Sequence, residues 1–305
     1  MIIRVIGDPH GVIDPSLDEA AFRAADLRMC TGDFAYHVQG ADRHRAVEVM
    51  GWLRNLDVLT ILGNHDGINH RPSLVYGPAE AEPAAQAEIL GALGDCHLGY
   101  STRDFEGLSV VGARPFSNGN PGIQHPPAGR ESITVQESAD LIVKLMSESA
   151  NPNLLILSHN GPRGLGTGPD APYGRDWRPP HDDWGDEDLG LALARVPAGK
   201  RVVAVVAGHM HHSIRGGGLR RRVGRFQGIP VLNAAIVPRA LPKGVLLARG
   251  EQATQEKKIL QPHRHFLELE LDAGMNLVRA GDFWARQGGA GREGVYLPLL
   301  GADLQ

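Results

Sequence analysis

Residues 2–10 read Ile-Ile-Arg-Val-Ile-Gly-Asp-Pro-His, an apolar run that ends in side chains able to bind a metal ion. The same arrangement occurs four more times along the chain. Runs that start at Leu27, Val58, Leu154 and Val202 lead to Asp33, to Asn64-His65-Asp66, to His159 and to His209-Met210-His211. In open α/β sheets, ligands bind at the carboxyl ends of the strands. If the five runs are strands of one fold, their ends converge on one polar site.

Short apolar runs alternate with helix-like stretches over the first 160 residues, which is typical of an α/β fold. The runs are apolar on both faces, which predicts buried strands of a mixed or parallel sheet at Leu27–Cys30, Val58–Leu62, Leu108–Val111 and Leu154–Leu157. Capping residues and apolar spacing predict four helices. The first helix starts at Ser16 or Asp18 and runs to about Ala25. The other three cover Ala41–Leu53, Pro83–Leu93 and the stretch around Val135–Met146.

The second half of the chain has a different character. Residues Gly161–Asp188 are rich in Gly, Pro, Asp and Trp, and long irregular loops of this kind are often functional. Further strands are expected at Val202–Ala207, Val231–Ala234, Gly244–Leu247, Phe266–Leu271 and Met275–Val278, with a hairpin turn at Asp272-Ala273-Gly274. We expect one domain over residues 1–285 and a Gly-rich C-terminal tail over 286–305.

Length and composition fit an ordinary globular protein. The 305 residues carry 22% charged side chains and a formal net charge of -4, which gives no sign of polyanion binding by bulk charge. The two cysteines, Cys30 and Cys96, provide no disulfide framework. We find no secretory signal and no apolar stretch near the roughly 18–20 residues that span a bilayer. The expected location is cytoplasmic, without a membrane partner.

The ligand types indicate a pair of transition-metal ions. Asp8 and His10 lie two residues apart, as do His209 and His211, and such pairs point to one side of a strand. Each pair is therefore expected to hold one ion. Carboxylate, imidazole and amide ligands suit Mn, Fe, Zn or Ni, and the absence of thiolates disfavours a structural zinc site. Glycines at positions 7, 32, 63 and 208 allow sharp turns and close backbone approach.

The charge of such a centre favours a phosphate ester as substrate. Two divalent ions bring four positive charges, while Asp8, Asp33 and a bridging hydroxide bring three negative ones. The cluster keeps a residual charge of about +1 by this idealised count. Two ions roughly 3.5–4 Å apart can also lower the pKa of a shared water and clamp a transferring phosphoryl group.

The five blocks together resemble the calcineurin-like metallophosphoesterase superfamily. The blocks are Asp8-x-His10, Gly32-Asp33, Gly63-Asn64-His65-Asp66, His159 and Gly208-His209-x-His211, and they cover about two thirds of the chain in this order. The resemblance implies a four-layer αββα sandwich, with two mixed sheets flanked by helices. The region 232–239 also resembles a bacterial and plastid subgroup of the superfamily.

The resemblance also implies a role for each residue. Asp8, His10 and His211 would hold the first metal, Asn64, His159 and His209 the second, and Asp33 would bridge both. His65 would protonate the leaving oxygen, and Asp66 would orient His65. The nucleophile would be the hydroxide that bridges the metals.

Two departures narrow the substrate. Asp33 is followed by Phe34-Ala35-Tyr36-His37, without the Arg that the Ser/Thr protein phosphatases of the superfamily carry there. The fourth block, His159-Asn160-Gly161-Pro162, matches the phosphodiesterase pattern only in part. We therefore expect a metal-dependent phosphatase or phosphodiesterase, manganese being one candidate metal, that acts on a small phosphodiester or phosphomonoester, for example a nucleotide.

Several residues allow two interpretations. The arginines between Arg215 and Arg225 fit a solvated hairpin better than an anion-steering rim, and Arg114 fits either a substrate contact or a surface charge. Tyr173, Trp177 and Trp184 could stack on a base, but such aromatics more often anchor a loop. His37 and His70 could border the cleft. Two rival functions are a non-catalytic scaffold with this fold and a nuclease that uses the Arg215–Arg225 cluster.

Overall fold

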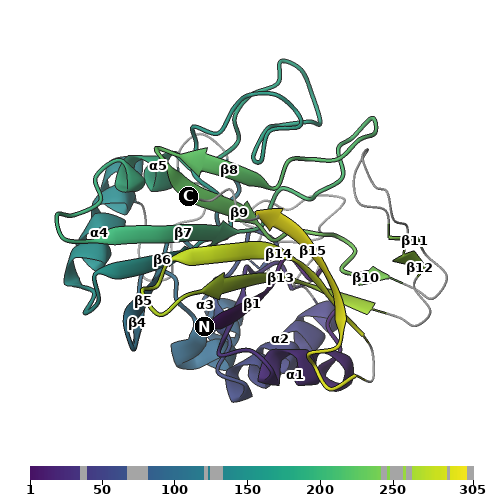
Figure 1. The fold of residues 1–305 in the computed structure, drawn as a ribbon. Helices are drawn as coiled ribbons and strands as arrows, with labels where there is room; N and C mark the ends of the chain where they lie inside the picture. Colours follow the sequence, from purple (N-terminus) through teal and green to yellow (C-terminus); the bar gives the residue numbers. More distant parts are fainter. Residues whose placement is uncertain are drawn as a thin grey trace.

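Two mixed β-sheets form the centre of the molecule (Figure 1). The computed structural model describes residues 1–34, 40–66, 82–119, 123, 133–241, 246–247, 257–258, 263–286 and 289–300. Sheet I has the order β15 (Gly294–Leu300), β14 (Leu277–Arg286), β13 (His263–Leu271), β1 (Ile2–Ile6), β2 (Leu27–Cys30) and β3 (Leu59–Thr60), and β10 (Ala240–Leu241) pairs with β13.

Sheet II contains six strands. Their order is β4 (Thr102–Phe105), β5 (Leu108–Gly112), β6 (Asn153–Leu157), β7 (Arg201–Ala207), β9 (Ile229–Asn233) and β8 (Val223–Phe226). A separate two-stranded pair joins β11 (Leu246–Leu247) to β12 (Lys257–Lys258).

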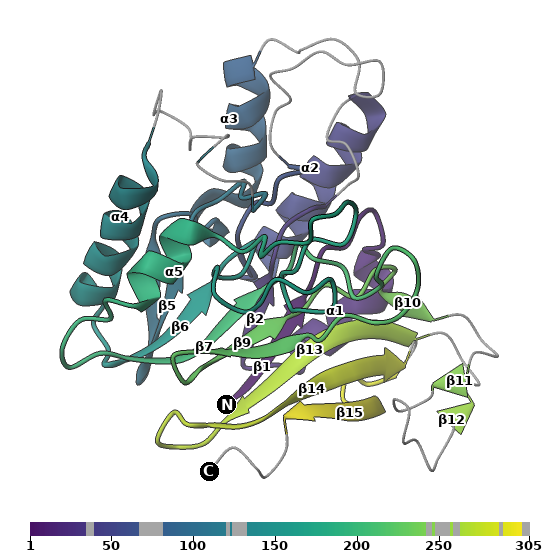
Figure 2. The ribbon, with the colours of Figure 1, turned by 90° about the horizontal axis from the view of Figure 1, so that it is seen from above.

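Helices cover the outer face of each sheet, which makes four layers. The helices α1 (Pro15–Arg23), α2 (Gly40–Asn55) and α3 (Glu82–Leu93) contribute to one apolar cluster with sheet I. The helices α4 (Val135–Glu148) and α5 (Glu187–Leu193) contribute to another with sheet II, and a 3-10 turn follows α3 at Gly94–Cys96. Figure 2 shows α4 and α5 side by side, well apart from α2 and α3. The predicted αββα sandwich is therefore confirmed.

The alternation of side chains along each strand builds the core between the sheets. On β1, Ile3 and Val5 point into the cluster shared by both sheets, while Ile6 packs toward the helices. On β6, Leu155 and Leu157 face the shared cluster, and their neighbours face α4 and α5. Because both faces of these strands are covered, both sets of positions must be apolar. This explains the continuous apolar runs in the sequence.

Strand direction brings the predicted ligands to one edge. The strands β1, β2 and β3 are parallel in sheet I, and β5, β6, β7 and β9 are parallel in sheet II. The segments that carry the ligands follow β1, β2, β3, β6 and β7 directly. The site is therefore assembled from the carboxyl ends of strands in both sheets.

The first helix begins earlier than the sequence predicted. Asp14 caps α1 and accepts a hydrogen bond from the backbone N–H of Ser16, and Pro15 occupies the first turn. The predicted cap Asp18 is instead buried, and its carboxylate binds both the guanidinium of Arg239 and the backbone N–H of Asp14. Thr134 and Glu137 form a capping box at the start of α4.

Five strands were not predicted, namely the two-residue strands β10 and β12 and the longer strands β4, β8 and β15. β4 and β8 lie at the two edges of sheet II and are only partly buried, so their sequences lack a strong apolar pattern. β15 lies within the predicted C-terminal tail, and it pairs antiparallel with β14 over Gly294–Leu300. That part of the predicted tail is thus a strand of sheet I, with Leu299 and Leu300 packed against the core.

Among the described residues, no helix combines the length and apolarity needed to cross a bilayer.

The ion pair between Asp18 and Arg239 provides a test of the packing. Both side chains are fully buried, so Asp18→Ala leaves a buried guanidinium without its carboxylate. We expect the free energy of unfolding to fall by about 3–5 kcal/mol, as measured by denaturant titration. The neighbouring Glu19→Ala is the control, because Glu19 pairs with Arg23 in solvent, and it should leave the midpoint nearly unchanged. Equal effects of both variants would contradict this account.

Candidate metal centre

Six donor side chains form two groups at the carboxyl ends of the strands. Asp8, His10 and His211 form the first half-site, and Asp33, His159 and His209 form the second. Within each group, one ligand atom per residue lies within 4.8 Å of the others. Asn64 joins the second half-site, because its Oδ1 lies 3.0 Å from Nε2 of His159. The structure therefore brings all seven predicted ligands together.

Asp33 stands between the two half-sites. Its Oδ2 lies 3.8 Å from Nε2 of His10 in the first group and 3.5 Å from Nε2 of His159 in the second. Its Oδ1 accepts the backbone N–H of His65 at 2.8 Å, which fixes the direction of the carboxylate. Oδ1 is thus fixed by a backbone hydrogen bond, while Oδ2 faces both half-sites.

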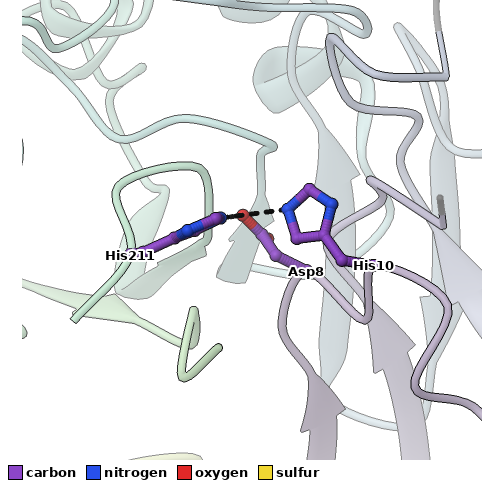
Figure 3. Close-up of side chains that lie close together, drawn as sticks. All are labelled: Asp8, His10 and His211. Atoms are coloured by element: carbon purple, nitrogen blue, oxygen red, sulfur yellow. Dashed lines mark hydrogen bonds and ion pairs between the residues drawn. The ribbon is translucent and has the colours of Figure 1, made fainter. Parts of the chain in front are cut away.

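Asp8 lies close to His10 and His211 in the first half-site (Figure 3). Its Oδ1 accepts the hydroxyl of Thr31 at 2.7 Å, and its Oδ2 accepts the backbone N–H of His209 at 2.6 Å. Nε2 of His211 lies 3.9 Å from Oδ2 of Asp8 and 3.0 Å from Nε2 of His10. Three donor atoms from two sheets therefore surround one small volume that a metal ion could fill.

The histidines are held in the form that binds metals. Nδ1 of His159 lies 2.7 Å from the carbonyl oxygen of Thr31, so it carries the proton and leaves Nε2 with a free electron pair. Burial lowers the pKa of His159 to about 3 and that of His211 to about 4. Burial also holds the pKa of His209 well below its usual value. All three rings are neutral at pH 7, as metal ligation requires.

The carboxylates show the opposite shift. Burial raises the pKa of Asp8 to about 7. Burial, together with the negative charge of Asp8, raises the pKa of Asp33 well above its usual range. Two adjacent buried carboxylates repel each other unless a cation lies between them. With neutral imidazoles beside them, this donor set fits a pair of divalent ions.

Backbone conformation, and not strand alternation, directs the ligands. Asp8, His10, Asp33 and His209 have φ angles of 40°, 42°, 58° and 67°. This left-handed region is uncommon for residues other than glycine and costs about 1–3 kcal/mol each. The expectation from residue spacing that His209 and His211 hold one ion together was wrong, because the turn directs them to different half-sites, as the family resemblance implied.

Two glycines allow the ligands to lie close to the backbone. A Cβ on Gly63 would lie 2.2 Å from Oδ1 of Asp33, and a Cβ on Gly208 would lie 2.0 Å from Oδ1 of Asp8. Any other residue would push these carboxylates away. The close approach predicted for the glycines beside the ligands is therefore present at positions 63 and 208.

Asp66 links two of the turns that carry predicted metal ligands. Its carboxylate accepts the backbone N–H groups of Asp33 and Phe34, at 2.7 and 2.9 Å, and that of Gly63 at 2.9 Å. These bonds join the turn after β2 to the turn after β3. The orienting role toward His65 stays a prediction.

His65 lies beside the first half-site. Its ring centroid is 5.2 Å from that of His10, with the two planes nearly perpendicular. The residue lines the same cleft as Asp33, His209 and His211. A proton donor at this position could act on a group bound to the donor atoms below it.

A cleft of about 700 Å³ opens above the donor atoms. Its floor contains Asp33, Asn64, His209 and His211, and its wall contains residues of the 161–188 loop and of the turn after β7. Figure 1 shows both segments, coloured teal and green, on the same side of the molecule. His37 and His70, which could border the cleft, lie outside the described residues.

The predicted arginines do not form a uniform surface. Arg114 is buried and pairs with Asp186 and Asp188, so it is neither a surface charge nor a substrate contact. Arg222 is buried against Asp282. Within the Arg215–Arg225 cluster, only Arg215 and Arg220 line the cleft. The favoured solvated hairpin is thus wrong for Arg220 and Arg222, which are buried.

The sequence patterns did not predict a role for Thr31 at the site. Its hydroxyl donates to Asp8 and accepts the backbone N–H of that residue, and its carbonyl oxygen accepts Nδ1–H of His159. One residue thus positions a ligand in each half-site. The signal available was a hydroxyl at the end of the second apolar run, two residues before Asp33.

Gly208→Ala tests the close approach at the first half-site. The new Cβ would overlap Asp8 and also lie 2.5 Å from Oγ1 of Thr31. We expect metal binding to weaken at least tenfold, as measured by calorimetric titration with Mn²⁺. Gly51→Ala in α2 is the control, because a Cβ at that position would meet no atom within 4 Å and metal binding should not change. Unchanged affinity in Gly208→Ala would contradict the geometry.

Asp8→Asn tests the electrostatic cost of the carboxylate cluster. Folding raises the pKa of Asp8 from near 4 to about 7, so its contribution to stability is present at low pH and is lost as the pH rises through 7. At pH 8, Asp8→Asn should raise the free energy of unfolding of the metal-free protein by about 1–3 kcal/mol while weakening metal uptake. Chemical denaturation at pH 5 and pH 8 measures the first effect. The exposed Asp95→Asn should change neither property, and a destabilised Asp8→Asn protein at pH 8 would refute the sign.

One family profile and several solved structures resemble this chain. The profile of the calcineurin-like phosphoesterase family matches residues 1–213. The 5'-nucleotidase precursor of Thermus thermophilus superposes with a TM-score of 0.50 and 16% identity, over 94% of this chain and 54% of that one. The calcineurin-like phosphoesterase YfkN of Bacillus subtilis gives a TM-score of 0.41 and 13% identity, over 98% of this chain and 90% of the other.

At these identities the structural likeness concerns the fold alone, and the chain spans only 54% of the nucleotidase structure. No curated protein sequence matches the chain. The family profile, however, covers well over half of the sequence and includes every predicted ligand. The chain belongs to the calcineurin-like phosphoesterase family.

Proposed function

We propose that this protein is a dinuclear metal-dependent phosphoesterase that hydrolyses a small phosphodiester or phosphomonoester. The observation that carries the proposal is the position of Asp33, whose Oδ2 faces both half-sites at the floor of a cleft. A carboxylate shared in this way can hold two ions close together. Two divalent ions bound there would supply an activated water and clamp the phosphoryl group.

The donor set favours Mn, Fe, Zn or Ni as the bound metals, because the ligands are imidazoles, carboxylates and one amide oxygen. Asp8, His10 and His211 would hold one ion, Asn64, His159 and His209 the other, and Asp33 would bridge them. This assignment follows the two groups of donor atoms and gives each ion at least one carboxylate.

His65 is the proposed general acid. It lies at the cleft, near the ring of His10 and directly after the ligand Asn64. From there it would donate a proton to the leaving oxygen of a phosphate bound at the half-sites. Asp66 supports this role by fixing the turns that carry Asp33 and Gly63, and by the proposed orientation of His65.

The cleft favours a small substrate over a long polyanion. Its volume of about 700 Å³ lies in the range of small-molecule sites. Of the arginines that could form a nucleic-acid rim, Arg222 is buried in an internal ion pair and Arg221 pairs with Asp170. A nucleotide is therefore a better candidate than a nucleic acid.

His65→Ala tests the catalytic proposal. We expect the Mn-loaded wild-type protein to hydrolyse alkyl phosphate mono- or diesters, whose alkoxide leaving group needs a proton, and His65→Ala to lower kcat for them by roughly 10²–10⁴-fold. Metal content should stay unchanged, since His65 is not a ligand. The control is His44→Ala, an exposed position on α2 that should keep full activity.

Two outcomes would oppose the proposal. A folded protein that takes up no metal would favour a non-catalytic scaffold. A metal-loaded protein that hydrolyses no mono- or diester, nucleotides included, would remove the enzymatic interpretation altogether.

A further inference from the structure

The 173–184 segment forms a hairpin-like loop with Trp177 near its tip. The backbone N–H of Trp184 donates to the carbonyl oxygen of Tyr173 at 2.7 Å, and that of Arg175 donates to Asp182 at 2.8 Å. Gly174 and Asp183 form an isolated antiparallel bridge between the two arms. The loop is therefore a defined structure, although it contains no regular strand or helix.

This loop is fastened to the turn that carries a predicted metal ligand. The carboxylate of Asp176 accepts the backbone N–H of Arg215 at 2.7 Å and lies 3.5 Å from the guanidinium of Arg220. The same guanidinium donates to the carbonyl oxygen of His211 at 3.0 Å and to that of Gly174 at 2.6 Å. Arg220 thus links the loop to the first half-site.

Trp177 presents an exposed aromatic ring to the cleft. The residue is 37% exposed and lines the cleft together with His65 and His211. Its ring meets that of Trp184 edge to face, with centroids 5.2 Å apart. Trp184 is itself buried, donates Nε1–H to the carbonyl oxygen of Asn118, and lies under the guanidinium of Arg175. The exposed ring is therefore held in place by a buried neighbour.

The other two aromatic side chains of this loop are buried in the core. Tyr173 is fully buried and Trp184 is 7% exposed, and both belong to the apolar cluster of α4 and α5. Arg178 and Arg215 flank Trp177 in the cleft lining, and both are exposed. Within the part of the chain that the structure describes, neither guanidinium forms an ion pair. The mouth of the cleft thus offers one aromatic face and two positive charges.

We propose that Trp177 determines specificity by stacking on a flat aromatic ring in the organic part of the ester, and that the substrate is a nucleotide. The inference rests on the proposed function, because the half-sites would hold the phosphate while the ring reaches the cleft wall. Stacking on an aromatic side chain is tolerant of the base, since every base has a π-face. The flanking arginines favour an anion and stack well themselves. A preformed platform also loses little conformational freedom on binding.

A pair of matched substrates tests the inference. Adenosine 5'-monophosphate and ribose 5-phosphate share the reacting phosphate and sugar but differ in the base. We expect the Mn-loaded wild-type protein to prefer the nucleotide at least tenfold in kcat/KM. Trp177→Leu keeps an apolar contact with Trp184 and should lower kcat/KM for the nucleotide about tenfold or more. The same variant should change ribose 5-phosphate hydrolysis less than about twofold.

Two further variants separate stacking from a fold defect. Trp177→Phe keeps an aromatic face and should retain most of the preference for the nucleotide. Leu191→Ala, which removes an exposed apolar side chain from α5 away from the cleft lining, should behave as wild type. A Trp177→Leu protein that loses both substrates equally, or a wild-type protein without preference for the base, would overturn the inference and leave the phosphoesterase proposal intact.

A binding measurement covers the case in which no ester is hydrolysed. Metal-loaded His65→Ala protein is titrated with adenosine 5'-monophosphate while tryptophan fluorescence is recorded. We expect saturable quenching that the double variant with Trp177→Leu lacks. Failure of hydrolysis with this quenching present counts against the proposed function alone, and quenching that Trp177→Leu does not alter overturns the inference.

Discussion

The carboxylate of Asp8 is the contact on which the site depends, because it joins the two sheets where their strands end. It accepts a hydroxyl from Thr31, which follows β2 in sheet I, and a backbone N–H from His209, which follows β7 in sheet II. The glycine before His209 lets the carboxylate lie against the backbone. Any shift of one sheet relative to the other would break this contact. The spacing of the half-sites is therefore set by the packing of the sandwich, and the apolar core between the sheets positions the chemistry.

Building this site opposes the stability of the metal-free protein. Buried carboxyl groups with raised pKa values, neutral buried imidazoles and four ligands with left-handed backbone all cost free energy. Three apolar clusters, one between the sheets and one under each helical layer, supply the opposing stabilisation. A divalent ion would relieve the repulsion between the carboxylates, and its binding free energy would then add to the stability of the fold.

The strands that are buried on both faces could be predicted from the sequence. The runs that became β1, β2, β6 and β7 are apolar throughout because each lies between two packed layers. The edge strands β4 and β8 are half-exposed and carry no such pattern. The sequence also predicted which candidate metal-binding residues lie close together, since each of them follows a run directly. Residue spacing could not predict the division of His209 and His211 between the half-sites, because that division depends on a left-handed turn, and only the family resemblance implied it. Nor could the burial of Arg114 or Arg222 be foreseen, because their partners lie 60 or more residues away in the sequence.

Specificity in this architecture requires a wall that is as well fixed as the floor. The 161–188 loop has no regular strand and only the start of α5, yet its backbone is held by buried side chains. Asp183 accepts the N–H groups of Gly164, Leu165 and Gly166, so one carboxylate replaces the hydrogen bonds that a strand would make. Arg220 meets three carbonyl oxygens of the loop and that of His211. A loop held in this way keeps its cleft-facing side chains in place before a ligand arrives. Under the proposed function, the sheets would therefore fix where phosphorus reacts, and the buried charges of the loop would fix the side chains that surround it.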